Sequence, residues 1–183
     1  GPVLLLLLLV ILAVGGTRQI YRKAGQRIVF APLPLVHKGE PPANVGALAF
    51  LGAWEMKSDN MDFGGFSALT ALRDGRLLAV SDAGILVGFA PPGSNITGRI
   101  FIAPLPGAFG DDVSFRDRDS EALAYDRETG RVWISYEGNP AIRRMTPSFA
   151  RIDGVARPAV IRAWKGNSGG EAFARLADGR FLL

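Results

Sequence analysis

"DSEALAYDRETGRVWISYE", residues 119–137, is the stretch that decides the fold. Thr129-Gly130 separates two short apolar stretches, and a glycine here favours a tight turn because it accepts a positive φ at little cost. The flanking residues are β-branched, aromatic or aliphatic and show no sustained 3.6-residue period. The stretch therefore predicts two antiparallel strands joined by a hairpin turn.

Two other segments repeat this pattern. They are "GGFSALTALRDGRLLAVSD", residues 64–82, and "GGEAFARLADGRFLL", residues 169–183. The turn glycines are Gly75, Gly130 and Gly179, so successive turns are 55 and 49 residues apart. A period of about 50 residues with one hairpin per repeat is typical of the four-stranded blades of a β-propeller.

The segments between the hairpins supply further strand candidates, at residues 84–90, 99–105, 141–145 and 159–164. Pro- and Gly-rich residues separate them, and no stretch predicts a helix of ordinary length. We therefore predict an all-β fold, a β-propeller of four-stranded blades that is incomplete in this chain, with about three blades present. Because Leu183 falls inside the expected second strand of the third hairpin, we expect the propeller to be truncated at its C-terminus.

The first residues differ in character from the rest. The apolar run from Val3 to Val14 would rise about 18 Å as a helix, against about 30 Å for the hydrocarbon core of a bilayer. We predict a signal-peptide-like segment at 1–16, a basic linker at 17–27 and the propeller domain at 28–183. The protein is then exported to the periplasm and meets the membrane only through this N-terminal segment. An uncleaved anchor and a buried core segment are the alternatives for the apolar run.

Composition excludes several classes of function. The chain has no cysteine, which rules out disulfides and thiolate metal sites. Its net charge of +4 comes largely from residues beside the apolar run, and no arginine stripe alternates with aromatic residues, so we predict no nucleic-acid partner. "GNSGGE", residues 166–171, is similar to the surroundings of a serine-protease nucleophile, but His37 is the only histidine and lies in a Pro-rich segment. Ser168 is therefore not expected to be a nucleophile.

Carboxylates recur at equivalent positions of the repeats. Glu121 and Glu171 begin a predicted strand, Asp82 and Glu137 follow the outgoing strands, and Asp119 stands just before Glu121. Equivalent strand positions in successive blades face the central channel, so these side chains would form an acidic ring of the kind that a hard cation such as Ca²⁺ requires. We predict that all five are metal ligands and that Glu121 and Glu171 are also the catalytic residues.

Such a ring has two possible uses. It could hold Ca²⁺, which neutralises phosphate oxygens and lowers the pKa of a bound water, or it could keep one carboxylate protonated as a general acid. Arg143 and Arg144 lie on alternate faces of a predicted strand, and one of them could face an anionic substrate. The plainer alternative is that the carboxylates only bind backbone N–H groups or face water.

Several segments resemble successive parts of a bacterial family known as phytase-like, or "esterase-like activity of phytase". They are residues 50–84, 119–145 and 167–183. The resemblance implies an exported propeller that hydrolyses phosphate esters or phosphodiesters, with a small anionic or ester substrate. It also implies an active centre formed by Asp82, Glu121, Glu137 and Glu171. Two rivals stay open: a non-catalytic periplasmic binding propeller, and a lactonase-type propeller hydrolase that uses Glu, Asp and Asn around one divalent ion.

Overall fold

The computed structural model describes residues 25–34, 44–45, 47–108, 112–163 and 170–183. The predicted segment at 1–16, most of the linker at 17–27, His37 and Ser168 lie outside these residues. Within the described part of the chain, no helix is both long enough and apolar enough to cross a membrane.

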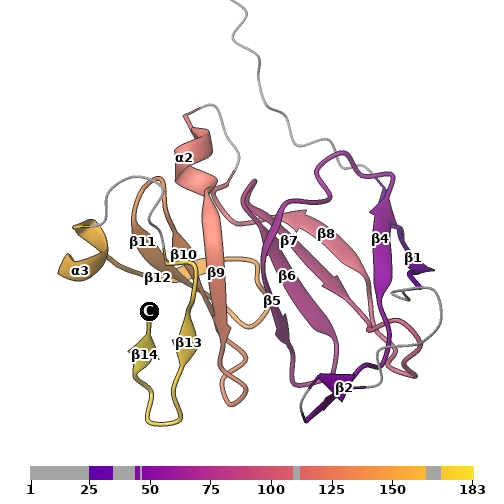
Figure 1. Cartoon of the computed structure of the whole chain (residues 1–183). Coiled ribbons are helices and arrows are strands. Elements are labelled where there is room, and N and C mark those ends of the chain that lie inside the picture. The colour runs from indigo at the N-terminus through magenta and orange to yellow at the C-terminus, as the bar shows by residue number, and fades with distance from the viewer. Residues whose placement is uncertain (1–24, 35–43, 46, 109–111, 164–169) are drawn as a thin grey trace, which may run out of the picture.

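Two four-stranded antiparallel sheets form the body of the molecule and lie side by side (Figure 1). The first, called the first blade, consists of β5 (Phe66–Ala71), β6 (Leu77–Ser81), β7 (Ile85–Phe89) and β8 (Phe101–Pro104). The second blade consists of β9 (Ser120–Tyr125), β10 (Val132–Tyr136), β11 (Ala141–Met145) and β12 (Ile152–Ala156). A third hairpin pairs β13 (Ala174–Arg175) with β14 (Phe181–Leu182). The prediction of an incomplete, propeller-like all-β fold is confirmed.

The turn glycines have the backbone conformation that the sequence predicts. The φ angles of Gly75, Gly130 and Gly179 are 84°, 71° and 86°. A side chain at these positions would strain the backbone, whereas glycine adopts this region freely. Each repeat therefore reverses direction at the expected residue.

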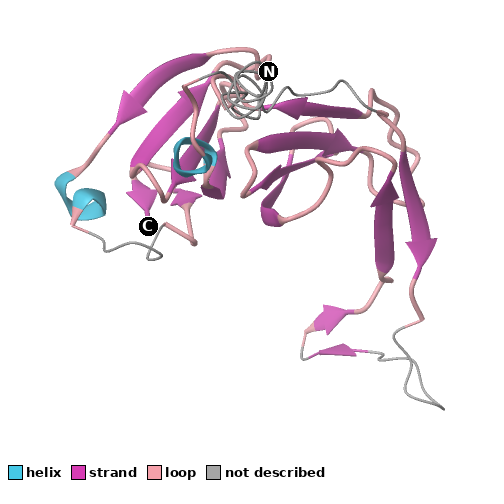
Figure 2. Cartoon of the chain, turned by 90° about the horizontal axis from the view of Figure 1, so that it is seen from above, coloured by secondary structure: helices cyan, strands magenta, loops and turns pink. Residues whose placement is uncertain are grey.

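The two blades face each other across a shared apolar core (Figure 2). Their first strands, β5 and β9, are adjacent (Figure 1). Leu78, Val80 and Leu86 of the first blade meet Ile134 and Tyr136 of the second blade in this core. On the other side of the second blade, the rings of Trp133 and Phe181 lie 5.2 Å apart and join it to the third hairpin. Packing between blades thus holds the first strands of successive blades next to one another.

The pair formed by β1 (Ile28–Pro32) and β4 (Trp54–Ser58) covers the outer face of the first blade. Between them in sequence, β2 (Asn44–Val45) pairs with β3 (Leu48–Ala49) in a separate short hairpin. Ile28 packs with Ile85, Val87 and Ile102 in a second apolar cluster. Because the first blade is covered on both faces, β7 is buried along its whole length and reads as a continuous apolar run.

One predicted strand is wrong. Within residues 159–164 the structure has a short helix, α3 (Ala159–Arg162), and the outer strand of the second blade is β12 instead. β12 pairs with β11 along four residues, from Ile142↔Ala156 to Met145↔Ile152. The carboxylate of Asp153 adds ion pairs with Arg131 at 3.2 Å and with Arg144 at 2.7 Å. The segment contains Asp and Gly, which have weak strand propensity, so its pairing depends on these contacts with the rest of the blade.

Candidate acidic site

Three carboxylates from the strand ends of the second blade converge at one end of the molecule. Asp119 and Glu121 stand at the start of β9, and Glu137 directly follows β10. One carboxylate oxygen from each residue lies within 4.8 Å of the others, and all three side chains are half-buried. The structure thus brings together three of the five predicted ligands.

A β-bulge directs Glu121 into this cluster. Ser135 pairs with Ala122, whereas the next residue, Tyr136, pairs with Ser120, so Glu121 is the extra residue of β9. The first blade has the same irregularity, with Ser67 as the extra residue between Phe66 and Ala68. A bulge leaves one residue unpaired and re-aims its side chain, and bulges are frequent beside active sites.

Backbone hydrogen bonds fix the other two carboxylates relative to each other. The N–H of Glu137 donates to the carbonyl oxygen of Asp119 at 2.9 Å, and in the first blade the N–H of Asp82 donates to Gly65 at 3.0 Å. Gly65 has φ 59°, and a Cβ at this position would lie 2.6 Å from Asp82 Oδ1. The second blade has Asp119 at the position of Gly65, which adds a carboxylate where the first blade has none.

Two buried serine hydroxyls join the blades at the same end. Ser120 Oγ donates to the carbonyl oxygen of Ser81 at 2.6 Å, and Ser135 Oγ donates to that of Gly170 at 2.8 Å. Ser81, Ser120 and Gly170 each directly precede a predicted acidic residue: Asp82, Glu121 and Glu171. These bonds therefore set the separation between carboxylates that come from different blades.

The cluster strongly perturbs the ionisation of Glu121. Burial, the charges of Asp119 and Glu137, a hydrogen bond to Asp119 and the charge of Glu171 together raise the pKa of Glu121 to about 7. Burial and the charge of Glu137 also raise the pKa of Asp119. Near neutral pH the cluster therefore stabilises a bound proton or a bound cation, because either one relieves the repulsion between carboxylates.

This perturbation predicts a pH dependence of stability. The unfolded chain releases the Glu121 proton near pH 4.5 and the folded chain near pH 7, so the stabilisation is complete below pH 4.5 and is lost as the pH rises through 7. Water screens the half-buried group, so we expect a loss of about 1 kcal/mol, or about 2–4 °C in Tm. Thermal unfolding with a chelator present, at a series of pH values from 4.5 to 8, measures this loss of stability.

The matched variants are Glu121→Gln and Glu128→Gln. Glu128 is an exposed glutamate in the turn of the same blade. The Tm of Glu121→Gln should not decrease in this way between pH 4.5 and 8, whereas the Tm of Glu128→Gln should decrease as in the wild type. An equally steep decrease in the wild type and in Glu121→Gln would contradict the assignment.

The remaining two predicted ligands lie around this cluster. Burial and the charge of Glu137 are the main causes of the raised pKa of Asp119, and the charge of Asp82 in the first blade raises that pKa further. Glu171, before β13, is exposed. Burial and the charges of Asp119 and Glu137 are the main causes of the raised pKa of Glu121, and the charge of Glu171 raises that pKa further. Neither belongs to the group of three within 4.8 Å. The catalytic roles of Glu121 and Glu171 stay predictions.

The sequence did not predict α2 (Phe115–Arg118), which lies before β9 at the acidic end (Figure 1). Ser114 donates through its N–H and its hydroxyl to Asp117 at 3.0 and 2.7 Å, and Asn139 Nδ2 donates to Asp117 at 3.2 Å. Arg116 Nε donates to the carbonyl oxygen of Gly138 at 3.2 Å. These bonds join α2 to the loop after Glu137. The signal was the Ser-x-x-Asp spacing, a capping-box pattern.

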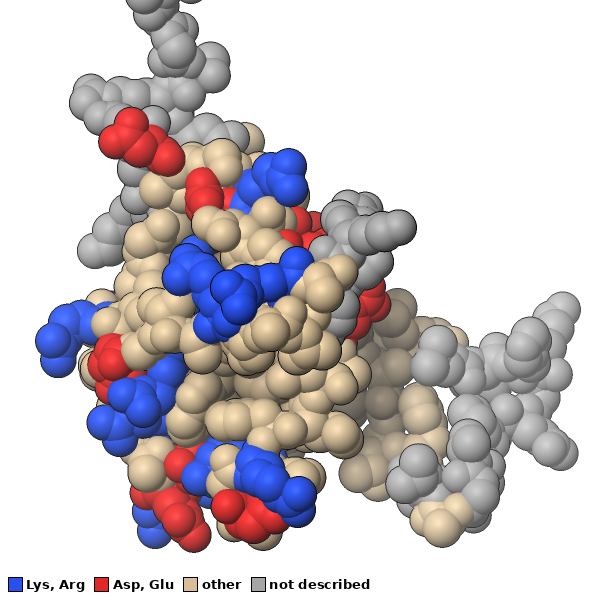
Figure 3. Space-filling view, turned by 90° about the vertical axis from the view of Figure 1, so that its left-hand side faces the viewer, with Lys and Arg blue, Asp and Glu red and all other residues tan. Residues whose placement is uncertain are grey.

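The two arginines of β11 have different surroundings. Arg144 pairs with Asp153 at 2.7 Å. Figure 3 shows one face of the molecule, on which basic and acidic side chains lie close together. Arg143 lies over the ring of buried Tyr136, 4.0 Å from its centroid. Hydrogen bonds from Ser114 and Asn139 are the main causes of the lowered pKa of Asp117, and the charge of Arg143 lowers that pKa further. Arg143, rather than Arg144, is therefore oriented toward the loops of the acidic end.

Sequence comparison identifies the family of the chain. The sequence model of the phytase-like family, described as "Esterase-like activity of phytase", matches residues 61–183, more than half of the chain. Both blades, the third hairpin and all five predicted ligands fall within that range. A search of curated proteins finds no match. The chain belongs to the phytase-like family, and this membership supports a hydrolase-type, esterase-like function.

Proposed function

We propose that Asp119, Glu121 and Glu137 form the centre of a hydrolase that acts on phosphate esters and uses a divalent cation, Ca²⁺ by preference. The observation that carries the proposal is the convergence of three carboxylates from the ends of two strands, within 4.8 Å of one another. Membership of the phytase-like family supports the reaction class.

The donor set fits Ca²⁺. Calcium binds oxygen ligands at about 2.3–2.6 Å, so two oxygens that share one ion lie at most about 5 Å apart. The three carboxylate oxygens lie within 4.8 Å of one another. When bound, the cation would neutralise phosphate oxygens and lower the pKa of a bound water.

The residues of the chain have separate tasks in this proposal. Asp119, Glu121 and Glu137 supply ligand oxygens, and the bond from the Glu137 N–H to Asp119 keeps their spacing. With the cation bound, Glu121 is ionised, because the cation displaces the proton that the cluster would otherwise hold. Its second carboxylate oxygen can then accept the proton of the attacking water, while the leaving ester oxygen takes its proton from solvent, and this general-base role is the one we assign to Glu121. Asp82 and Glu171 add negative charge around the cation.

Arg143 is the residue that we assign to the substrate anion. Among the described residues, no carboxylate is within ion-pair distance of its guanidinium, whereas Arg144 is paired with Asp153. A guanidinium binds phosphate oxygens through two parallel hydrogen bonds. Stacking on Tyr136 holds the planar group in one orientation.

The location of the protein is part of the proposal. We infer export to the periplasm from the apolar run between Val3 and Val14, with a small anionic or ester molecule as the substrate.

The test is a substrate panel on the full chain, with 4-nitrophenyl phosphate, bis(4-nitrophenyl) phosphate and a γ-lactone. We expect turnover of at least one phosphoester, loss of that turnover in EDTA, and recovery when Ca²⁺ is added back. Turnover that is indifferent to EDTA would exclude the cation. Hydrolysis of the lactone alone would indicate a lactonase-type enzyme, and calcium binding without any turnover would indicate a binding module.

A further inference from the structure

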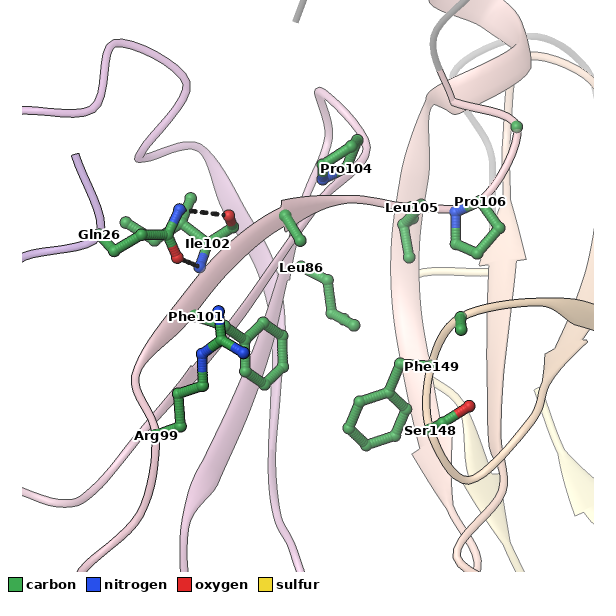
Figure 4. Close-up of a pocket in the computed structure, with 13 residues that line it drawn as sticks. Gln26, Leu86, Arg99, Phe101, Ile102, Pro104, Leu105, Pro106, Ser148 and Phe149 are labelled. Atoms are coloured by element: carbon green, nitrogen blue, oxygen red, sulfur yellow. Dashed lines mark hydrogen bonds between the residues drawn. The ribbon is translucent and has the colours of Figure 1, made fainter. Parts of the chain in front are cut away.

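A cavity of about 730 Å³ lies between the two blades, separate from the acidic site (Figure 4). One wall is β8 with the turn that follows it, and the other wall is the turn between β11 and β12. Its volume falls within the roughly 300–1,000 Å³ typical of small-molecule sites. None of the five predicted acidic ligands lines it.

The cavity wall is mainly apolar. Leu86 of β7, Phe101 of β8 and Leu105 contribute from the first blade, and Phe149 contributes from the second. The rings of Phe101 and Phe149 lie 6.2 Å apart with a tilt of 34°. An apolar ligand in this cavity would be removed from water by both blades at once.

Phe149 has an unusual backbone conformation. Its φ is 59°, and it is the one residue other than glycine with a positive φ in the described part of the chain. For a bulky residue this conformation costs about 1–3 kcal/mol and persists only where the surroundings enforce it. The turn is closed by the Phe149 N–H, which donates to Thr146 at 2.8 Å. This geometry holds the phenyl ring at the cavity (Figure 4).

Arg99 is the one charged residue among those that line the cavity. Its side chain is exposed, and no described carboxylate forms an ion pair with it. Gln26 is already engaged, because its amide donates to Ile102 at 2.9 Å and accepts from the Ile102 N–H at 2.7 Å. The cavity therefore combines an apolar wall with one available positive charge at its edge.

We propose that this cavity binds a small amphiphilic carboxylate. The apolar chain lies against Leu86, Phe101 and Phe149, and the carboxylate pairs with the Arg99 guanidinium. The geometry of guanidinium and carboxylate suits two parallel hydrogen bonds. This binding site is independent of the hydrolytic function proposed for the acidic cluster.

The test is calorimetric titration of the full chain with octanoate, with octanamide as the uncharged analogue. We expect one octanoate per chain and a Kd about tenfold higher for octanamide, because a hydrogen bond to a charged group contributes more than one to a neutral group. Octanoate that does not bind, or octanamide that binds equally well, would overturn the proposal.

Three variants locate the binding. Arg99→Gln should raise the Kd for octanoate about tenfold, whereas Arg127→Gln, a change of an exposed arginine in the turn of the second blade, should not. Ala103→Trp should block binding, because Ala103 lines the cavity and an indole would fill it. Octanoate affinity that is unchanged by both Arg99→Gln and Ala103→Trp would show that the ligand binds elsewhere and would overturn the proposal.

Discussion

We expect Glu121→Gln to lower kcat for the proposed phosphoester hydrolysis by about 10²–10⁴-fold, the range for loss of a general acid or base. Glutamine keeps the size of the side chain but cannot accept a proton from water, and it removes one anionic ligand from the cluster. Because Glu121 is the bulged residue of β9, the substitution leaves the strand pairing on both sides of it unchanged. The measurement is steady-state hydrolysis of 4-nitrophenyl phosphate at saturating Ca²⁺.

Glu128→Gln is the matched control for this experiment. It makes the same chemical change on the same blade, in an exposed turn, and should leave kcat within twofold of the wild type. If Glu121→Gln retained wild-type kcat while remaining folded, Glu121 would not be the general base.

The second large effect is on stabilisation by calcium. If Ca²⁺ binds as proposed, a free Ca²⁺ concentration of about 100 times Kd should stabilise the folded chain by about 2.7 kcal/mol, which corresponds to a rise in Tm of about 5–10 °C. Glu137→Gln removes one of three charged ligands and should weaken binding at least about tenfold, so the rise in Tm at the same Ca²⁺ concentration should fall to half or less. Thermal unfolding with and without Ca²⁺ measures both values.

Glu128→Gln again serves as the control and should keep the full rise in Tm. If Glu137→Gln showed the same rise as the wild type, the calcium would bind at a site that does not include Glu137.

The parts of the fold that local chemistry determines could be predicted from the sequence. Gly75, Gly130 and Gly179 have the positive φ that their turns require, and the hairpins around them form as expected. Here a single residue type decides the backbone conformation, so pattern and period were sufficient.

The parts that depend on distant contacts could not be predicted. The apolar pattern of residues 159–164 predicts a strand, but the outer strand is β12, which pairs with β11 and carries the ion pairs of Asp153 with Arg131 and Arg144. The cover that β1 and β4 provide over the first blade also depends on contacts between remote residues, such as Ile28 with Ile102.

The candidate site was predicted in part. The recurrence of carboxylates at strand ends predicts that Glu121 and Glu137 belong to one acidic group, and the structure brings these two together with Asp119. The sequence did not reveal the bulge that directs Glu121 or the serine bonds that set the spacing between blades, because both depend on the register of paired strands. For the same reason it could not separate the three converging carboxylates from Asp82 and Glu171.

The most direct test of the acidic site is a calorimetric titration of the full chain with Ca²⁺ at pH 8, in parallel with Glu121→Gln and Glu128→Gln. We predict one Ca²⁺ per chain for the wild type and for Glu128→Gln, and binding at least about tenfold weaker for Glu121→Gln. No calcium binding by the wild type, or equal affinity in all three proteins, would contradict the assignment of Asp119, Glu121 and Glu137 to one cation site.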